Sequence, residues 1–389
     1  GHRPPDAPGQ SEGIVRHAMK LAHLTRFLLP LSAATALTGC FDSGGSSGSD
    51  DTRTGQIHFQ GVGGLTYQTS SQSGKTNTRG EFRYYPGETL SVKVGNLPIA
   101  EGIPAREYVT FLEFQEDTRT ALQTPGVDDE GLSSHQVREQ LLFENSTLMN
   151  LSRFLLALNW TENVDEDEGI DIRERVINQL NRALDNPNLP NTVNFNVSTS
   201  EFTAENSPAN QILAEICFYP EDDPLCGQPP TQEEIDNATE RPVDGELDPD
   251  IDYKEDLEAL RERILQSVRN MDEFDNEQAR NYLRRELAAI TRALSRQYYL
   301  SPEDATPPAG DNGIKSVKVR KIRGDAQLAQ LQAQSTRPTD VYINAESWQE
   351  AEVEYVVDGP KGGESEILVN FRPEGTYRWV RKQIRILID

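Results

Sequence analysis

Apolar and polar residues alternate with a period of two between residues 56 and 115, and glycine or asparagine separates the runs. The alternating apolar positions are Ile57, Phe59, Leu65, Tyr67, Phe82, Tyr84, Leu90, Val92 and Val94. Such alternation is typical of strands with one buried face. We therefore predict a small antiparallel β-sandwich-like module over residues 56–115.

The period lengthens to three or four residues over residues 130–218 and again over residues 257–300, which is typical of amphipathic helices. The first region has its apolar stripes at Val137, Leu141, Leu142, Leu148, Leu151, Leu155, Leu158, Ile172, Val176, Ile177, Leu180 and Leu184. The second has them at Leu257, Leu260, Ile264, Val268, Met271, Tyr282, Leu283, Leu287, Ile290, Leu294 and Tyr298. We expect a central α-helical region that continues, after residues 219–256, in an antiparallel helical hairpin.

Residues 314–389 return to β patterns, with Asp358-Gly359 and Gly362-Gly363 as turns. The predicted strands lie at residues 317–320, 341–343, 353–357, 367–371 and 378–388. The fold class predicted for the whole chain is α+β, with an N-terminal β-sandwich, a central helical region and a C-terminal antiparallel β domain.

Two segments have the composition of linkers. Residues 40–55 are rich in glycine, serine and aspartate and predict a flexible tether. Residues 219–256 are acidic and rich in proline, which predicts a disordered linker. A weak cation site at the alternating acids Asp244 to Asp252 is the alternative reading of that linker.

The beginning of the chain has the features of a bacterial secretory leader over residues 19–39. Lys20 and Arg26 form a positive front, and an apolar run leads to Leu37-Thr38-Gly39-Cys40. A membrane-spanning helix needs about 20 apolar residues, and this run is shorter and contains Pro30. We interpret residues 1–18 as an upstream mis-start that precedes the natural first methionine.

The sequence Leu37-Thr38-Gly39-Cys40 resembles the lipobox of bacterial lipoproteins. The resemblance implies cleavage before Cys40, a covalent diacylglyceryl lipid on the Cys40 sulfur and acylation of the new amino terminus with palmitate-like chains. Several acyl chains together hold a protein firmly on a membrane. Because residue 41 is Phe and not Asp, family analogy favours the outer membrane, facing either the periplasm or the cell surface.

The charge of the chain indicates which partners are excluded, and its cysteines indicate the compartment in which it folds. The chain carries 38 Lys plus Arg against 63 Asp plus Glu, a net charge of -25, which argues against nucleic acid as a partner. Of the three cysteines, Cys217 and Cys226 enclose a short proline-containing loop and predict a disulfide in an oxidising periplasm. A metal site is the alternative, although two cysteines without nearby histidines supply too few ligands.

Residues 56–185 resemble a module of Gram-negative envelope lipoproteins and adhesin-like proteins. The similarity rests on the strand and turn pattern around Gly80-Glu81-Phe82, which is also similar to prealbumin-like sandwiches, and on two later motifs. These are Asn150-Leu151-Ser152-Arg153 on a helix and Gly169-Ile170-Asp171-Ile172 after an acidic loop. The whole chain also resembles proteins described as organic-solvent transport components, and this resemblance implies an accessory role in lipid or solvent transport as an alternative function.

The acidic loop is the best candidate for cation chemistry. Asn163, Asp165, Asp167 and Asp171 are spaced to wrap a hard cation such as Ca²⁺. Against this, Glu168 stands where an EF-hand loop requires glycine, and a solvated charge run explains the same residues. Calcium binding and a solvated loop both stay open from the sequence.

Candidate catalytic residues are few after the leader, where His58 and His135 are the remaining histidines and lie far apart in the sequence. We therefore predict a protein that is not an enzyme: a lipid-anchored envelope protein with a structural or binding role and an envelope protein or a glycan as partner. A glycan hydrolase that uses two carboxylates is a further alternative.

Basic residues on the first and last C-terminal strands predict a cationic patch only if those strands are neighbours.

Overall fold

The computed structural model describes residues 51–389, so the predicted leader, lipobox and most of the tether lie outside the described residues. Helices and strands both contribute, and the strands form several mostly antiparallel sheets. The predicted α+β class is confirmed.

Two sheets form the first β module. The first has strand order β5-β1-β8, and the second has order β4-β3-β6-β7. Their bounds are β1 Arg53–Ile57, β3 Thr66–Gln68, β4 Ser73–Lys75, β5 Glu81–Tyr84, β6 Thr89–Val94, β7 Leu97–Pro104 and β8 Tyr108–Val109. In β6 the residues Leu90, Val92 and Val94 are buried, as the alternation predicts. The β1–β8 pairing is parallel, unlike the other pairings in these two sheets.

Short helices and strands follow, and helices occur over both predicted apolar stripes of residues 130–218: α2 and α3 over the first, and α4 over the second. In α2, however, Leu141 is exposed and the buried residues are His135 and Glu139. The elements are η1 Phe111–Glu113, α1 Glu116–Ala121, β9 Gly126–Val127, β10 Ser133–Ser134, α2 His135–Leu142, α3 Ser146–Ala157, β11 Ile170–Asp171, α4 Glu174–Asp185, α5 Thr199–Thr203 and α6 Pro208–Leu213. Every residue of α3 after Ser146 is buried. A short parallel pairing joins β11 to β2 (Val62–Gly63) in the first module.

The segment after α6 differs from the expected linker. Cys217 and Cys226 form a disulfide, with Cα atoms 5.5 Å apart, around η2 (Pro224–Cys226). A short helix, α7 (Gln232–Asp236), follows with a capping box at Thr231, and its Ile235 is buried. Residues 239–252 are exposed throughout, in keeping with their acidic composition.

The expected hairpin of two long helices is not formed. Helix α8 (Lys254–Ser267) packs against α7 and η2, and α9 (Asn276–Ser295) follows the one-turn helix η3 (Met271–Glu273) and packs against α3. Helix α8 buries only Ile264, whereas α9 buries eight of its residues. The helical stripe ends earlier than predicted, because Tyr298 belongs to a strand.

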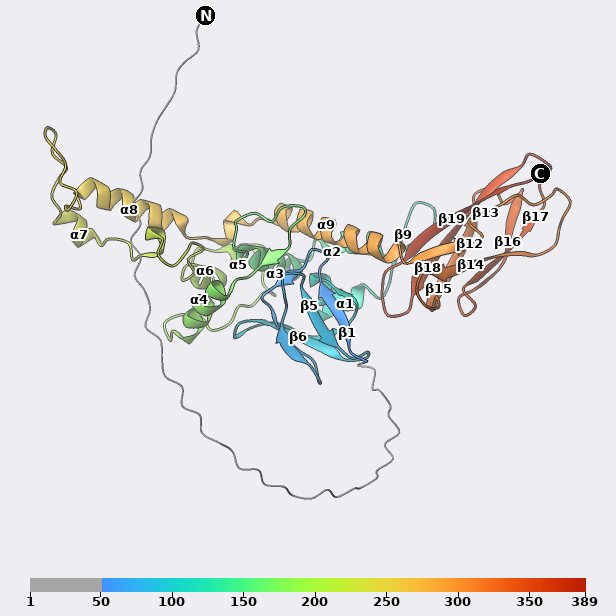
Figure 1. Cartoon of the computed structure of the whole chain (residues 1–389), viewed down its shortest axis with the longest axis horizontal. Coiled ribbons are helices and arrows are strands. Elements are labelled where there is room, and N and C mark those ends of the chain that lie inside the picture. Colours follow the sequence, from blue (N-terminus) through green and yellow to red (C-terminus); the bar gives the residue numbers. More distant parts are fainter. Residues whose placement is uncertain (1–50) are drawn as a thin grey trace, which may run out of the picture. The chain divides into compact units, whose positions relative to one another are not determined.

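The C-terminal β domain is a sandwich of two four-stranded sheets, drawn in orange to red in Figure 1. One sheet has order β12-β14-β17-β16 and the other β13-β19-β18-β15. The bounds are β12 Tyr298–Ser301, β13 Asp304–Ala305, β14 Lys315–Lys321, β15 Leu328–Ser335, β16 Val341–Ser347, β17 Glu352–Val357, β18 Glu364–Pro373 and β19 Val380–Leu387. The five predicted strands are present, and β12, β13 and β15 are additional.

The buried apolar residues form two cores, and α9 contributes to both. Tyr282, Leu283 and Leu287 belong to the core of the first module and the central helices. Leu294, in the last turn of the same helix, belongs to the core of the C-terminal sandwich. In return, Tyr377 from the turn before β19 packs into the first core.

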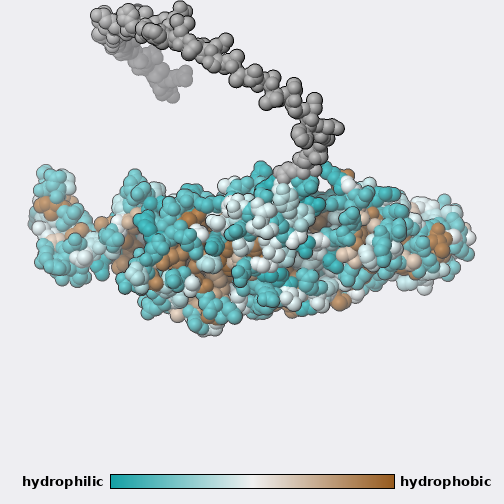
Figure 2. Space-filling model, turned by 90° about the horizontal axis from the view of Figure 1, so that it is seen from below, coloured by the Kyte–Doolittle hydropathy of each residue, from teal (hydrophilic) through white to brown (hydrophobic). Residues whose placement is uncertain are grey.

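No helix within residues 51–389 is long and apolar enough to cross a membrane. Figure 2 shows hydrophilic residues over most of the face in view, with apolar residues in small scattered patches.

Candidate functional site at the junction

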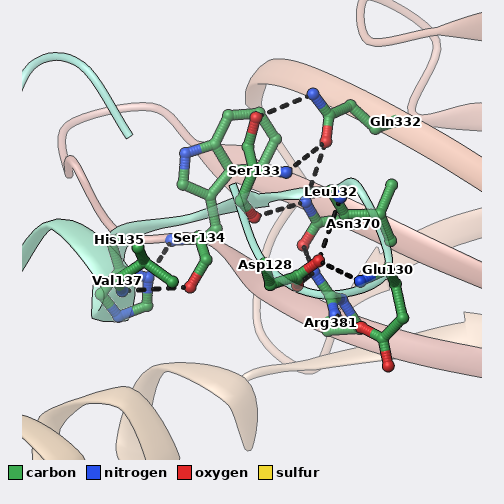
Figure 3. Close-up of polar contacts among 11 residues, drawn as sticks. Asp128, Glu130, Leu132, Ser133, Ser134, His135, Val137, Gln332, Asn370 and Arg381 are labelled. Carbon is green, nitrogen blue, oxygen red and sulfur yellow. Dashed lines mark hydrogen bonds and ion pairs between the residues drawn. The ribbon is translucent and has the colours of Figure 1, made fainter. Parts of the chain in front are cut away.

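A connected set of polar contacts lies where the hairpin β9–β10 and helix α2 meet the C-terminal sandwich. We call this set the junction: Asp128, Glu130, Ser133, His135 and Glu139 on one side, and Gln332, Asn370, Tyr377, Trp379 and Arg381 on the other. Figure 3 shows the larger part of it. Its two sides are more than 190 residues apart in sequence.

Local sequence fixes the hairpin side of the junction. The Asp128 carboxylate accepts hydrogen bonds from the backbone N–H groups of Glu130 and Leu132, each at 3.0 Å, and so closes the turn before β10. The Ser134 hydroxyl accepts from Val137 N and caps the first turn of α2. Aspartate and serine are favoured at such positions because their short side chains reach the backbone.

Strand register fixes the sandwich side. Gln332 in β15 pairs with Asn370 in β18, and Asn370 pairs with Arg381 in β19. Directly opposed residues on neighbouring strands project to the same face of a sheet. The three side chains therefore form one polar row across three strands.

Gln332 and Asn370 of this polar row bind the backbone and the hydroxyl group of Ser133 in the hairpin (Figure 3). Gln332 accepts from Ser133 N at 3.0 Å through Oε1 and donates from Nε2 to Ser133 Oγ at 2.8 Å. Asn370 Nδ2 donates to the Ser133 carbonyl at 2.9 Å. Every one of these bonds depends on an amide side chain, so the hairpin is bound in one register.

Arg381 completes the row with two ion pairs. Its Nη2 lies 2.6 Å from Asp128 Oδ2 and its Nη1 lies 2.6 Å from Glu130 Oε2. Partial burial acts to raise the pKa of Asp128, but the hydrogen bonds from Arg381 and from two backbone N–H groups hold that pKa below its usual value. The pairs thus favour the ionised carboxylate that closes the turn.

His135 is buried and links three elements. Its Nδ1 accepts from Trp379 N at 2.9 Å, so the ring proton is on Nε2, which lies 2.9 Å from Thr291 Oγ1 on α9. Burial, followed by the positive charge of Arg378, lowers the pKa of His135 to about 3. Because both ring nitrogens are engaged, a neutral His135 serves the packing of α2, α9 and β19.

Glu139 lies one helical turn after His135 and is also buried. Its Oε2 accepts from the Tyr377 hydroxyl at 2.6 Å. Burial raises the pKa of Glu139 to about 7, although the charge of Arg378 and the bond from Tyr377 act in the opposite direction. A buried carboxyl of this kind is a weak acid near neutral pH.

His58 in the first module has the same structural role. Its Nε2 accepts from Phe111 N at 3.0 Å, so Nδ1 carries the proton and lies 2.7 Å from the Tyr282 hydroxyl on α9. Burial, then the charges of Arg378 and Arg285, lower the pKa of His58 to about 3. One turn further on, Glu286 accepts from Phe59 N and Gln60 N at 2.8 and 3.0 Å.

The predicted calcium residues lie on an exposed loop. Asn163, Asp165 and Asp167 are exposed, and Asp171 is half-buried and forms an ion pair with Arg173 at 2.9 Å. The carbonyl oxygens of Asp165 and Glu168 accept from the Arg285 guanidinium at 2.7 and 3.2 Å. Within residues 51–389 no three His, Cys, Asp or Glu side chains are grouped closely enough to hold a metal ion. Calcium binding stays a prediction.

The motifs that carry the family resemblance serve packing in this fold. A Cβ atom on Gly169 would lie 2.2 Å from the Gly61 carbonyl oxygen, so glycine permits β11 to approach the first module. Arg153 on α3 is buried and donates to the carbonyls of Met271 and Phe274. Asn150 donates to the carbonyls of Phe195 and Val197 at 3.0 Å.

The basic residues of the first and last C-terminal strands do not form one patch, because β14 and β19 belong to different sheets. Several of them have acidic partners: Lys315 with Asp311, Lys318 with Glu352, Arg381 with Asp128 and Glu130, and Arg385 with Glu364. Arg378 is buried.

Sequence reasoning missed the junction. The signal available was the turn pattern Asp128 to Gly131 before a serine and a histidine, which predicts a capped helix but not its distant partners. Gln332 and Asn370 have no pattern that marks them apart from other polar strand residues.

Comparison with known proteins gives little help. No family model matches the chain, and no curated protein matches it. Among solved structures, domains 1–6 of the surface layer protein SbsC align with 24% of this chain and 13% of that chain, at 11% identity and a TM-score of 0.18. SbsC domains 4 and 5 align with 23% of this chain and 50% of that chain, at 11% identity and a TM-score of 0.18. The titin M3 domain aligns with 22% of this chain and 88% of that chain, at 12% identity and a TM-score of 0.16. Matches this weak carry no argument about function.

Proposed function

We propose that this chain is a lipid-anchored envelope protein with a non-catalytic structural or binding role. The observation that carries the proposal is the charged front, apolar run and Leu37-Thr38-Gly39-Cys40 at the start of the chain. A covalent lipid on Cys40 would attach the body to a membrane, and the outer membrane is the favoured one by family analogy.

The geometry of the described residues supports the non-catalytic part. Each histidine uses a ring nitrogen to accept a backbone N–H and holds its other ring nitrogen within hydrogen-bond distance of a hydroxyl on α9. A histidine that acts as a general base needs a free lone pair directed at its substrate. Here each neutral ring uses its single in-plane lone pair to accept a backbone N–H from an element that is distant in sequence.

The junction supports a role in which the relative position of two bodies matters. The hairpin is bound by three hydrogen bonds to Gln332 and Asn370 and by two ion pairs to Arg381, and α9 enters both cores. Such a connection holds the C-terminal sandwich at a fixed place on the anchored body. A protein of this design presents the sandwich to an envelope protein or a glycan.

Labelling tests the anchor. Cells that express the chain are grown with radiolabelled palmitate, and the purified protein is expected to carry the label. The Cys40→Ser variant should lose it completely. The double variant Cys217→Ser, Cys226→Ser is the matched control and should keep it, because those sulfurs are joined to each other. Absence of label from the unmodified chain would refute the anchor.

Capture from intact envelopes tests the binding role. The acylated chain, cross-linked in cells and purified with and without a chelator, is expected to recover the same envelope protein or glycan reproducibly. A partner that is lost with chelator and also lost in the Asp165→Asn, Asp167→Asn variant would support calcium at the acidic loop. Recovery of no partner under either condition would contradict the binding role.

A further inference from the structure

Four arginines line one small cavity between the first module and the turn before β19. They are Arg106, Arg119, Arg372 and Arg378, and the cavity has a volume of about 90 Å³. Glu113 is the one carboxyl group among its lining residues. In a chain with a net charge of -25, four guanidinium groups against one carboxylate is a strong local excess of positive charge.

Arg378 is the unusual member of this set. Only 3% of the residue is exposed, and its Nε and Nη2 atoms are buried without a hydrogen-bond partner. Buried guanidinium nitrogens in folded proteins almost always have acceptors, because leaving a charged donor unpaired in a protein interior is costly. The Tyr377 side chain and the charges of Glu113 and Glu139 act on Arg378, but its Nε and Nη2 atoms keep no acceptor.

The other three arginines are positioned but not neutralised. Arg119 donates to the carbonyls of Glu113 and Gly102 at 2.8 and 2.7 Å, and Arg372 donates to the Thr376 carbonyl at 3.0 Å. Arg106 Nη1 lies beside Gly375, since a Cβ atom built on Gly375 would be 3.6 Å from that nitrogen. Among residues 51–389, none of the four guanidinium groups has a carboxylate within ion-pair distance.

Glu113 offsets only part of this charge. Its carboxylate Oε2 accepts from Thr110 N at 2.7 Å and closes the capping box of η1, and the charges of Arg378 and Arg106 act on it from beyond ion-pair distance. At short range and away from bulk water, several like charges repel strongly. A bound anion would remove that repulsion.

We propose that this arginine cavity binds a phosphate-sized oxyanion. The cavity is larger than the roughly 10–15 Å³ that one water molecule needs and smaller than the roughly 300 Å³ at which drug-sized pockets begin. Guanidinium groups bind phosphate oxygens by paired hydrogen bonds, and a phosphate carries more negative charge than a carboxylate. The ion is either free phosphate or the terminal phosphate of a lipid headgroup. This inference does not depend on the lipid anchor proposed above.

Calorimetric titration of the purified full chain with inorganic phosphate at low salt is the test. We expect one saturable site per chain, at least tenfold weaker in the Arg106→Gln, Arg372→Gln variant, whose positions are exposed and half-buried. Arg320→Gln on the exposed surface of β14 is the matched control and should bind within twofold of the unmodified chain. No saturable binding, or equal binding by the double variant, would overturn the proposal.

A second arm distinguishes the sources of the phosphate. The full chain with Cys40→Ser, which cannot carry an acyl chain, is sedimented with vesicles of phosphatidylcholine that do or do not contain phosphatidic acid. Sedimentation that requires phosphatidic acid and is lost in the double arginine variant assigns the cavity to a headgroup. Phosphate binding in the calorimeter without such sedimentation assigns it to the free ion. Sedimentation that persists in the double arginine variant would overturn the headgroup assignment.

Discussion

Helices α8 and α9 lie close together in the sequence and have similar amphipathic patterns, yet they have opposite roles. Helix α8 buries only Ile264 and leaves Leu265 about half exposed, at 52%. Helix α9 buries eight residues and contributes to both cores. Along its length, Tyr282 contacts His58, Glu286 accepts from Phe59 N, and Thr291 contacts His135. The comparison shows that an apolar stripe predicts a helix but not how much of the fold depends on it.

Truncating a core residue of each helix should give the largest difference. Leu283→Ala on α9 removes a fully buried side chain and should lower the free energy of unfolding by about 3 kcal/mol, within the roughly 2–5 kcal/mol typical of such changes. Leu265→Ala on α8 should cost less than about 0.5 kcal/mol. Denaturant unfolding followed by circular dichroism measures both. Equal losses would contradict the comparison.

The buried Glu139 on α2 should make the stability of the folded chain depend on pH. The pKa of Glu139 is about 7 in the folded chain, above its ordinary value of 4.5. The folded state therefore keeps this proton to higher pH than the unfolded state does. The stabilisation is complete below about pH 4.5 and is lost as pH rises through 7.

Glu139→Gln removes that loss. Relative to the unmodified chain, the variant should gain up to about 3 kcal/mol in unfolding free energy between pH 4.5 and pH 8, from about 1.4 kcal/mol per unit of pKa shift. His58 titrates in both proteins and cancels in the difference. A constant difference for Glu139→Gln would contradict the raised pKa.

Glu286 tests the contact of α9 with the first module. Its carboxylate accepts two backbone N–H groups, from Phe59 and Gln60, so Glu286→Ala would leave both donors without this acceptor. We expect a loss of about 2 kcal/mol, since each unpaired buried donor costs roughly 1–3 kcal/mol. The exposed Glu258→Ala on α8 should be nearly neutral. Thermal unfolding of the two variants at one pH measures both losses.

The smallest expected effect separates two arginines of β19. Arg381 is 30% exposed and bridges Asp128 and Glu130, whereas Arg385 is 61% exposed and pairs with Glu364. Arg381→Gln should cost about 1 kcal/mol and Arg385→Gln less than about 0.5 kcal/mol, in the range of exposed ion pairs. Hydrogen exchange of the Ser133 amide should increase only in the Arg381 variant. Unchanged exchange there would show that the ion pairs do not hold the hairpin.

Periodicity was sufficient for the fold class and for the presence of helices at α2, α3 and α4. It did not give the buried face of α2, whose buried residues are His135 and Glu139 while Leu141 is exposed. It failed for β15, whose sequence Leu328–Ser335 is rich in alanine and glutamine and has low strand propensity. It also failed for β12, since Tyr298 continues the helical spacing of α9 by coincidence and only the sandwich edge turns it into a strand.

The junction and the arginine cavity could not be predicted for a different reason. Their residues come from segments more than 190 positions apart, and each residue type is ordinary in its own segment. The disulfide partners, by contrast, are nine residues apart and are two of only three cysteines. Short-range chemistry is readable in one sequence, and long-range contacts require the fold.

Mass spectrometry of the amino-terminal peptide of the protein purified from membranes tests the central claim most directly. We predict a peptide that begins at Cys40, with a diacylglyceryl group on its sulfur and an acyl group on its nitrogen. A peptide that begins at another residue, or an unmodified Cys40 sulfur, would contradict the account.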